Sequence, residues 1–182
     1  RIYVTGNPIN EVIQYYDRKI SRSRVLASLG LTAGQYFLVT MHRAENVDLQ
    51  ERLKNLLLAL DKISKKYTLP VIVSLHPRAK NKMEQFGLKG SNKNVRFLEP
   101  FGFFDFITLE KNARCVITDS GTVQEECCIF RVPNITIRDV TERPETLESG
   151  SNMLVSVSPD LILGSLEVVL NEKREWQPPV EY

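Results

Sequence analysis

Cysteine and histidine are scarce in this sequence. There are three cysteines, Cys115, Cys127 and Cys128, of which two are adjacent and none forms a C-x-x-C pair. An odd number of cysteines without metal-binding spacing argues against a disulfide framework and against a zinc site. We therefore expect buried thiols in a cytoplasmic protein that holds no metal.

Long apolar runs and an excess of either charge are absent as well. No run approaches the ~20 residues of a membrane span, so we expect no membrane partner. With 24 Lys and Arg against 22 Asp and Glu, the net charge of +2 gives no reason to expect nucleic acid as a partner. A basic cluster, Arg78, Lys80 and Lys82, is interpreted as a solvated loop. The chain opens on Arg1 without an initiating Met, which we interpret as a fragment that lacks an N-terminal part.

Short apolar segments alternate with helical patterns along the rest of the chain. The 42% of apolar residues can form a core of ordinary size. Strands that are apolar on both faces are typical of sheets covered on both sides. The pattern predicts an α/β fold, a Rossmann-like, doubly wound parallel sheet with helices on both faces. The expected strands are Tyr36–Met41, Val71–Leu75, Val95–Leu98, Cys115–Thr118, Asn134–Ile137 and Met153–Val157.

Helices are expected between these strands. The strongest pattern runs from Leu49 to Tyr67, with Asp48 as its cap and Glu51 in the position of a capping box. A later helix is expected to follow a Ser158 cap and Pro159. The later expected helices are Phe104–Asn112, Val123–Phe130 and Leu161–Asn171.

The first thirty residues differ from the remainder. Ile2–Thr5 could be a strand or an extended hinge, and Ile9–Leu29 has a helical pattern. We therefore divide the chain into a hinge and connecting segment, 1–30, and one Rossmann-like domain, 31–182.

Ligands of open parallel sheets bind outside the carboxyl ends of the strands, and both histidines are predicted to lie there. His42 follows the first strand of the domain and His76 follows the second. Each can be a structural hydrogen-bonding residue or a part of the site, and both interpretations stay open.

The residues from Asp119 to Glu126 form the strongest local signal. Ser120 and Gly121 stand at a strand-to-helix turn, where a hydroxyl, a close backbone approach and free helical N–H groups suit a diphosphate. Glu126 lies where a ribose would follow, and a carboxylate accepts from paired hydroxyls. The alternative is that Ser120 only caps the helix and Glu126 is solvated. The sequence contains no P-loop and no G-x-G-x-x-G.

Two further groups could reach the same edge of the sheet. Arg143 offers a rigid fork of donors to a phosphate or sugar, or else forms a salt bridge with Glu142 or Glu145. An aromatic cluster follows the third strand, and while most of it should be core, one ring could stack on a base. Its members are Phe101, Phe103, Phe104 and Phe106.

Five separated segments resemble, in order, the non-hydrolysing UDP-N-acetylglucosamine 2-epimerases. They are 4–8 (VTGNP), 39–46 (VTMHRAEN), 76–77 (HP), 119–126 (DSGTVQEE) and 138–145 (RDVTERPE). The resemblance implies two Rossmann-like domains with a cleft between them, an arrangement shared with one large class of glycosyltransferases. This chain is similar to the C-terminal, UDP-binding domain.

The resemblance also implies a reaction. The family inverts C2 of a UDP-sugar by eliminating UDP and adding it back, without cofactor or metal. The carboxylates that move the proton belong mainly to the N-terminal domain. The full-length enzyme is expected to be a cytoplasmic homodimer that serves capsule or cell-surface polysaccharide synthesis.

Site residues carry over by position. His42 is implied as the catalytic residue that assists departure of the diphosphate, and Glu126 as the ribose ligand. Arg43 and His76 fall where family members contact a second, allosteric UDP-sugar. The remaining implied UDP ligands are Ser120, Gly121, Thr122, Arg143 and, for uracil, Phe106.

Two departures from the family pattern leave the sugar open. The family turn is commonly Ser-Gly-Gly, but here the third residue is Thr122. Its β-branched side chain restricts the backbone conformations of the turn more than glycine does. The loop 100–104 (PFGFF) also differs, and both features resemble a branch that acts on 6-deoxy sugars to make UDP-N-acetyl-L-fucosamine. A glycosyltransferase donor domain and a non-catalytic nucleotide-binding module remain alternatives.

Overall fold

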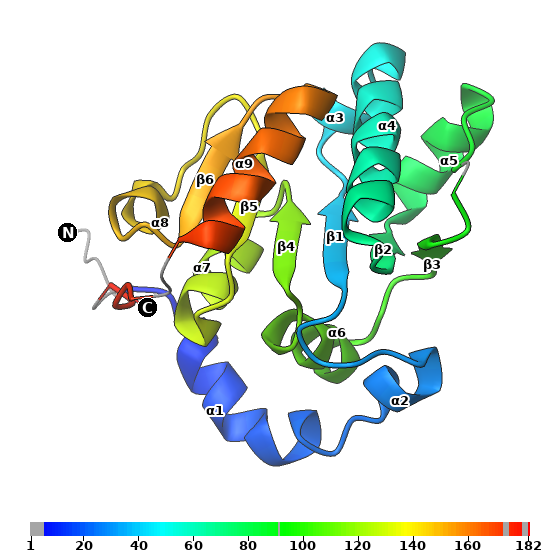
Figure 1. Cartoon of the computed structure of the whole chain (residues 1–182). Helices are drawn as coiled ribbons and strands as arrows, with labels where there is room; N and C mark the ends of the chain where they lie inside the picture. The colour runs from blue at the N-terminus through cyan, green and yellow to red at the C-terminus, as the bar shows by residue number, and fades with distance from the viewer. Residues whose placement is uncertain (1–5, 91, 173–174, 180–181) are drawn as a thin grey trace.

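The computed structural model describes residues 6–90, 92–172, 175–179 and 182, and its centre is a parallel sheet of six strands (Figure 1). The strand order is β3-β2-β1-β4-β5-β6, and every neighbouring pair is parallel. The predicted strands are confirmed to within two residues at each end. Their bounds are β1 Phe37–Met41, β2 Val71–Leu75, β3 Val95–Leu98, β4 Cys115–Thr118, β5 Asn134–Ile137 and β6 Asn152–Val155.

Helices cover both faces of the sheet, as the apolar strands predicted. Alternate residues of β1 point to opposite sides, with Phe37 and Val39 in one apolar core and Leu38 in another. The first core is closed by α4 (Gln50–Tyr67) and α9 (Pro159–Asn171). The second is closed by α2 (Val25–Leu29), α6 (Phe103–Lys111) and α7 (Gly121–Phe130). The fold is therefore the doubly wound, Rossmann-like one.

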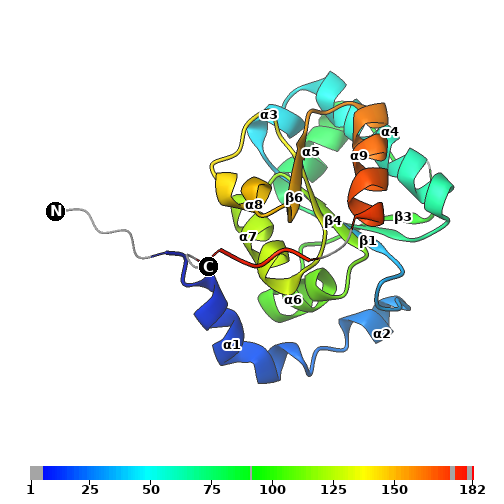
Figure 2. The same cartoon turned by 60° about the vertical axis from the view of Figure 1, so that its left-hand side comes forward.

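The helical segment near the N-terminus is interrupted, which corrects the prediction of one helix over Ile9–Leu29. Helix α1 (Ile9–Ile20) ends at a turn, where the Ser23 hydroxyl accepts from the Val25 N–H and donates to Asp105. Ile13 and Ile20 of α1 are buried against Ile107 of α6, and α1 and α2 run along the outside of α6 (Figure 2). The expected strand or hinge Ile2–Thr5 lies outside the described residues.

Three helices of the structure were not predicted, namely α3 (Ala44–Val47), α5 (Pro77–Gln85) and α8 (Pro144–Glu148). In α5 the buried residues are Ala79 and Met83, so its apolar stripe is too sparse to signal a helix. The interpretation of Arg78, Lys80 and Lys82 as a loop is therefore wrong, because these residues belong to α5.

Of the two predicted caps, Asp48 is wrong, whereas Ser158 is confirmed as the N-cap residue of its helix. Leu49 and not Asp48 occupies the N-cap of α4, and the Asp48 carboxylate instead pairs with Arg78 of α5. Ser158 occupies the N-cap of α9, but its side chain makes no capping hydrogen bond. Pro159 takes the first helical position as expected, so α9 begins two residues before Leu161.

The three cysteines are buried thiols. In the part of the chain that the structure describes, no helix has the length and apolar character needed to cross a membrane.

Candidate functional site

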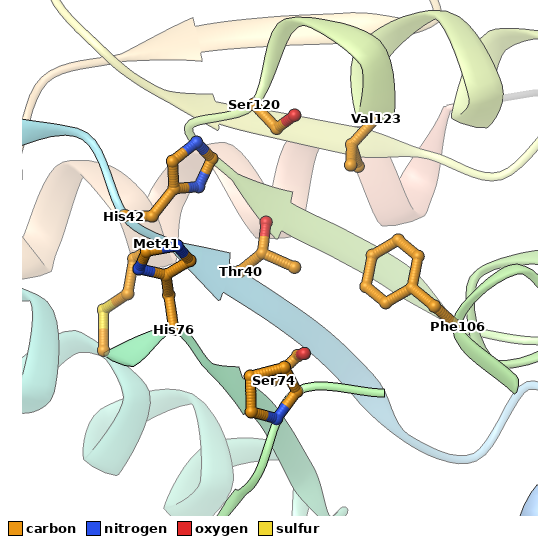
Figure 3. Close-up of a pocket in the computed structure, with 9 residues that line it drawn as sticks. Thr40, Met41, His42, Ser74, His76, Phe106, Ser120 and Val123 are labelled. Atoms are coloured by element: carbon orange, nitrogen blue, oxygen red, sulfur yellow. The ribbon is translucent and has the colours of Figure 1, made fainter. Parts of the chain in front are cut away.

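A cavity lies at the carboxyl ends of β1 and β4, the point where the strand order reverses direction along the sheet. This is the place where open α/β sheets bind ligands. The cavity holds about 200 Å³ and brings together four of the predicted site residues, His42, His76, Phe106 and Ser120. Figure 3 shows their side chains converging from four segments distant in sequence. The complete lining is Thr40, Met41, His42, Ser74, His76, Pro100, Phe106, Ser120 and Val123.

The turn between β4 and α7 leaves the Ser120 hydroxyl without a capping hydrogen bond. Ser120 is the N-cap residue of α7, with φ −87° and ψ 136°, but its side chain makes no capping hydrogen bond. Its backbone N–H instead donates to the Thr118 hydroxyl at 3.0 Å. The interpretation of Ser120 as a mere cap is therefore wrong. Its hydroxyl lines the cavity beside the first-turn N–H groups of α7, which attract anions.

His42 is held in place by a buried carboxylate, Asp119. The His42 Nδ1 atom lies 3.2 Å from Asp119 Oδ1, and the His42 backbone N–H donates to the same carboxylate. Asp119 also accepts from the Arg43 N–H and from Asn46 Nδ2, and its side chain is fully buried. The negative charge of Asp119 beside Nδ1 favours a proton on that atom, which leaves Nε2 as the ring nitrogen available to a ligand.

The protein groups around His42 favour a neutral ring. Burial is the largest cause and lowers its pKa below the ordinary 6.5. Asp119 opposes this shift, while His76 and Arg43 add to it. An anion in the cavity would act in the opposite direction and favour the imidazolium.

The two histidines differ in role. His76 is the N-cap of α5, and its Nδ1 accepts from the Arg78 N–H at 3.1 Å. Its ring centroid lies 5.6 Å from that of His42, on the same cavity wall. His76 thus has a structural role and also faces the cavity.

Arg143 lies beside the turn at Ser120 and Gly121, and its partner differs from the two considered for it in the sequence analysis. Its guanidinium pairs with Glu125 of α7 at 2.6 Å, so the expected salt bridges to Glu142 or Glu145 are wrong. A Cβ added to Gly121 would meet this guanidinium at 4.0 Å. Glu125 is buried and also accepts from Asn7 Nδ2. This hydrogen bond connects the segment before α1 to the first turns of α7.

Glu126 of α7 is buried where this helix packs against α6, so the interpretation of a solvated side chain is wrong. It follows Val123, which lines the cavity, by three residues. The two side chains therefore lie on the same face of α7. Burial, the largest cause, raises its pKa to about 7, and Glu125 adds to the shift, while a hydrogen bond with Glu110 opposes it. Glu126 is not one of the residues that line the cavity.

The aromatic cluster divides as the sequence suggested. Phe106 packs against the second core and lines the cavity, while Phe101 packs against that core as well. Phe104 packs with α1, and Phe103 is exposed at the surface. Phe106 is thus the ring available to a base.

Sequence reasoning assigned no role to Asp119 or to Arg138. Arg138 is buried, and its guanidinium bonds Glu45 at 3.0 Å and both carboxylate oxygens of Glu142. It thereby joins the loop that carries His42 to the loop that carries Arg143. The available signal was position, since Asp119 and Arg138 each come directly after a strand.

Gln124 of α7 forms hydrogen bonds to two of the loops at the site, those that contain Ser120 and Thr141. Its amide nitrogen donates to the Ser120 carbonyl, and its oxygen accepts from the Thr141 hydroxyl. Thr122 is exposed in the first turn of the helix. Among the described residues, no group of three or more His, Cys, Asp or Glu side chains is arranged to hold a metal ion.

Comparison with known proteins agrees with this geometry. The family model for UDP-N-acetylglucosamine 2-epimerase matches residues 1–182. This chain belongs to that family. It is 46% identical over 195 residues to the UDP-N-acetylglucosamine 2-epimerase of Methanococcus maripaludis, and 43% identical over 186 residues to that of Methanocaldococcus jannaschii. Each alignment covers 98% of this chain and 50% of the relative, so the chain spans about half the length of these proteins.

Solved structures give the same result. The chain superposes with a TM-score of 0.90 on the M. jannaschii UDP-GlcNAc 2-epimerase in complex with UDP-GlcNAc and UDP. The superposition covers 98% of this chain and 50% of that structure, at 43% identity. The fold predicted from the sequence and the family that it resembles are thus both confirmed.

Proposed function

We propose that this chain is the UDP-binding domain of a UDP-N-acetylglucosamine 2-epimerase, with 31–182 as the nucleotide domain and 1–30 as the hinge segment. One observation carries the proposal. At the switch point of the sheet, the free Ser120 hydroxyl, the N-terminus of α7 and the Nε2 side of His42 face one cavity. This arrangement suits a diphosphate between an anion-binding turn and a proton donor.

In this proposal the nucleotide extends along α7. The diphosphate lies against Ser120, Gly121 and Thr122, within reach of the Arg143 guanidinium. Uracil stacks on Phe106, and the ribose hydroxyls donate to Glu126. In support, Ser120 and Phe106 line the cavity, and Gly121, Thr122 and Glu126 lie on α7, which begins beside it. The Arg143 guanidinium lies 4.0 Å from a Cβ built on Gly121.

The proposed reaction breaks the bond between C1 of the sugar and the UDP oxygen. A base removes the C2 proton, the C1–C2 double bond of a glycal forms, and the electron pair of the broken bond leaves with UDP. His42 donates from Nε2 to the departing phosphate, because Asp119 holds its Nδ1 and a diphosphate favours the imidazolium. Protonation of C2 on the opposite face and re-addition of UDP complete the epimerisation.

The remaining expectations are part of the same proposal. Arg43 and His76 contact a second UDP-sugar, supported by the position of His76 beside His42. The whole enzyme works as a homodimer in the cytoplasm and serves cell-surface polysaccharide synthesis, which rests on the family alone.

The test is NMR in D₂O of UDP-GlcNAc with a protein that joins this chain to the N-terminal half carried by its relatives. We expect deuterium at C2 and the manno epimer, with no acceptor added. His42→Asn should slow formation of UDP and glycal together. Deuterium exchange only with a 6-deoxy UDP-sugar would mean that this sugar, and not UDP-GlcNAc, is the substrate. Turnover only with a sugar acceptor would indicate a glycosyltransferase.

A further inference from the structure

Glu110 is a fully buried carboxyl group for which the proposed reaction has no use. It lies on α6 one turn after Phe106, so both side chains share a face of the helix, and Phe106 lines the cavity. Across the α6–α7 contact, Glu110 interacts with Glu126. Its Oε1 accepts from Cys127 Sγ at 3.2 Å, and its buried Oε2 accepts no hydrogen bond from the described residues, so Oε2 is the oxygen that can carry a proton.

Two carboxyl groups buried side by side cannot both ionise at low cost. Burial first and the charge of Glu126 second raise the pKa of Glu110 well above its ordinary value. Glu126 keeps 5% of its surface exposed and Glu110 none, so the negative charge is better placed on Glu126. Glu110 then carries the proton of the pair.

The other ionisable groups to consider act on the pair from α7 and β4 or contact α6 from α1. On α7, Glu125 acts on Glu126 and Cys127 bonds Glu110, while Cys115 of β4 acts on Cys127. From α1, Lys19 lies over the ring of Phe104 and Asp17 pairs with Lys111. Neither α1 charge contributes to the shifts of the two carboxyls given above.

We propose that Glu110 is a positioning residue for nucleotide recognition: as a neutral acid it donates a hydrogen bond to the Glu126 carboxylate, orients it toward the ribose and couples UDP binding to proton release. The inference rests on the proposed function, which places the ribose at Glu126. Glu110 itself touches no ligand.

The sign of the proton coupling follows from which form binds. Ribose hydroxyls donate to the carboxylate and therefore favour its ionised form. Because burial raises the pKa of Glu126 to about 7, UDP affinity should rise with pH up to about 7 and then level off. In the proposed function, pyrophosphate binds the same turn and His42 as UDP but has no ribose. The pH dependence of pyrophosphate affinity therefore measures the titration of all groups other than Glu126.

Two substitutions of Glu110 separate a positioning role from packing. Glu110→Gln keeps a donor to Glu126, whereas Glu110→Met keeps the length and removes the donor. Replacing a buried carboxyl by an apolar side chain of similar length does not threaten folding, so Glu110→Met should unfold at the same temperature as the wild type or higher. The test is NMR titration of this chain with UDP and with pyrophosphate, from about pH 6 to about pH 8.

We expect Glu110→Met to weaken UDP about tenfold at neutral pH, since a lost hydrogen bond to a charged group has about this effect. The side-chain ¹³C signal of Glu126 should titrate at higher pH, and pyrophosphate affinity should not change. Glu110→Gln should bind UDP as the wild type does. Identical UDP affinity and an identical Glu126 titration in all three proteins would overturn the inference, while binding of neither ligand would overturn the proposed function itself.

Discussion

At the scale of single residues, the site depends on which hydrogen-bonding groups are already used and which are free. The Asp119 carboxylate accepts from the backbone N–H groups of His42 and Arg43 and from Asn46 Nδ2, which fixes the loop after β1. The same carboxylate lies 3.2 Å from the His42 Nδ1 atom. The Ser120 hydroxyl has no such partner in the capping position and faces the cavity. A ligand therefore meets Ser120 and the outer nitrogen of His42 without breaking an existing hydrogen bond.

Replacement of Glu126 tests the ribose contact directly. Glu126→Gln removes a charged acceptor worth roughly 1.5–3 kcal/mol and should weaken UDP by about ten- to a hundredfold. Pyrophosphate binding should stay as in the wild type. Titration calorimetry on this chain measures both, with Glu172→Gln, an exposed acid after α9, as the matched control. Equal UDP affinity of Glu126→Gln and the control would remove Glu126 from the site.

Residue types at the site could be predicted, but their partners could not. His42, Ser120 and Arg143 follow strands or open helices, and this position alone marked them as candidates. The partner of Arg143 proved to be Glu125, eighteen positions earlier on α7, because the loop after β5 folds back over the start of that helix. Glu126 could not be known to be buried, since its burial depends on how α6 packs against α7.

At the scale of elements, the sheet could be predicted because each strand is a short apolar run bounded by polar turns. The helices α4, α6, α7 and α9 have apolar residues that face a core, and each was predicted approximately. The short helices α3 and α8 and the polar α5 lack such a stripe. They are fixed by tertiary contacts, such as the ion pair between Arg78 of α5 and Asp48, and the periodicity of the sequence does not predict these contacts.

Two loops of the site are joined by the ion pairs of Arg138, and this network predicts a pH dependence of stability. The hydrogen bonds from Arg138 lower the pKa of Glu142 to about 2 from 4.5. Because the folded-state pKa is depressed, the stabilisation is complete above the unfolded-state pKa of about 4.5 and is lost as the pH falls toward about 2.

Glu142→Gln should therefore lower the melting temperature near neutral pH, and its difference from the wild type should shrink as the pH falls below 4.5. Differential scanning calorimetry over this range is the measurement. Glu148→Gln, at an exposed acid of α8, is the control and should show a smaller effect. A difference that stays constant down to about pH 2 would contradict the role assigned to Arg138.

At the scale of the whole molecule, the chain contains a complete core but one wall of the proposed cleft. Apolar clusters fill both faces of the sheet, and α1 is packed onto α6 by a third. The segment 175–179 returns to α7, where Trp176 Nε1 donates to the Cys128 carbonyl at 3.1 Å. Folding therefore needs no partner, whereas the cavity opens from the carboxyl edge of the sheet toward solvent.

We accordingly expect the 182-residue chain to fold cooperatively, to bind UDP weakly and to catalyse nothing. Binding should be weak because this chain forms only one wall of the proposed cleft, so the phosphates stay exposed to water. Water strongly weakens charge interactions. Catalysis should fail because removal of a C2 proton needs a positioned base, and the resemblance places that base in the other half of the enzyme. The measurement is incubation of the chain with UDP-GlcNAc, followed by NMR for UDP, glycal and the manno epimer. Turnover would require a base within the chain, and Glu45 and Glu142 could serve only after leaving Arg138. Substituting each in turn would then identify it.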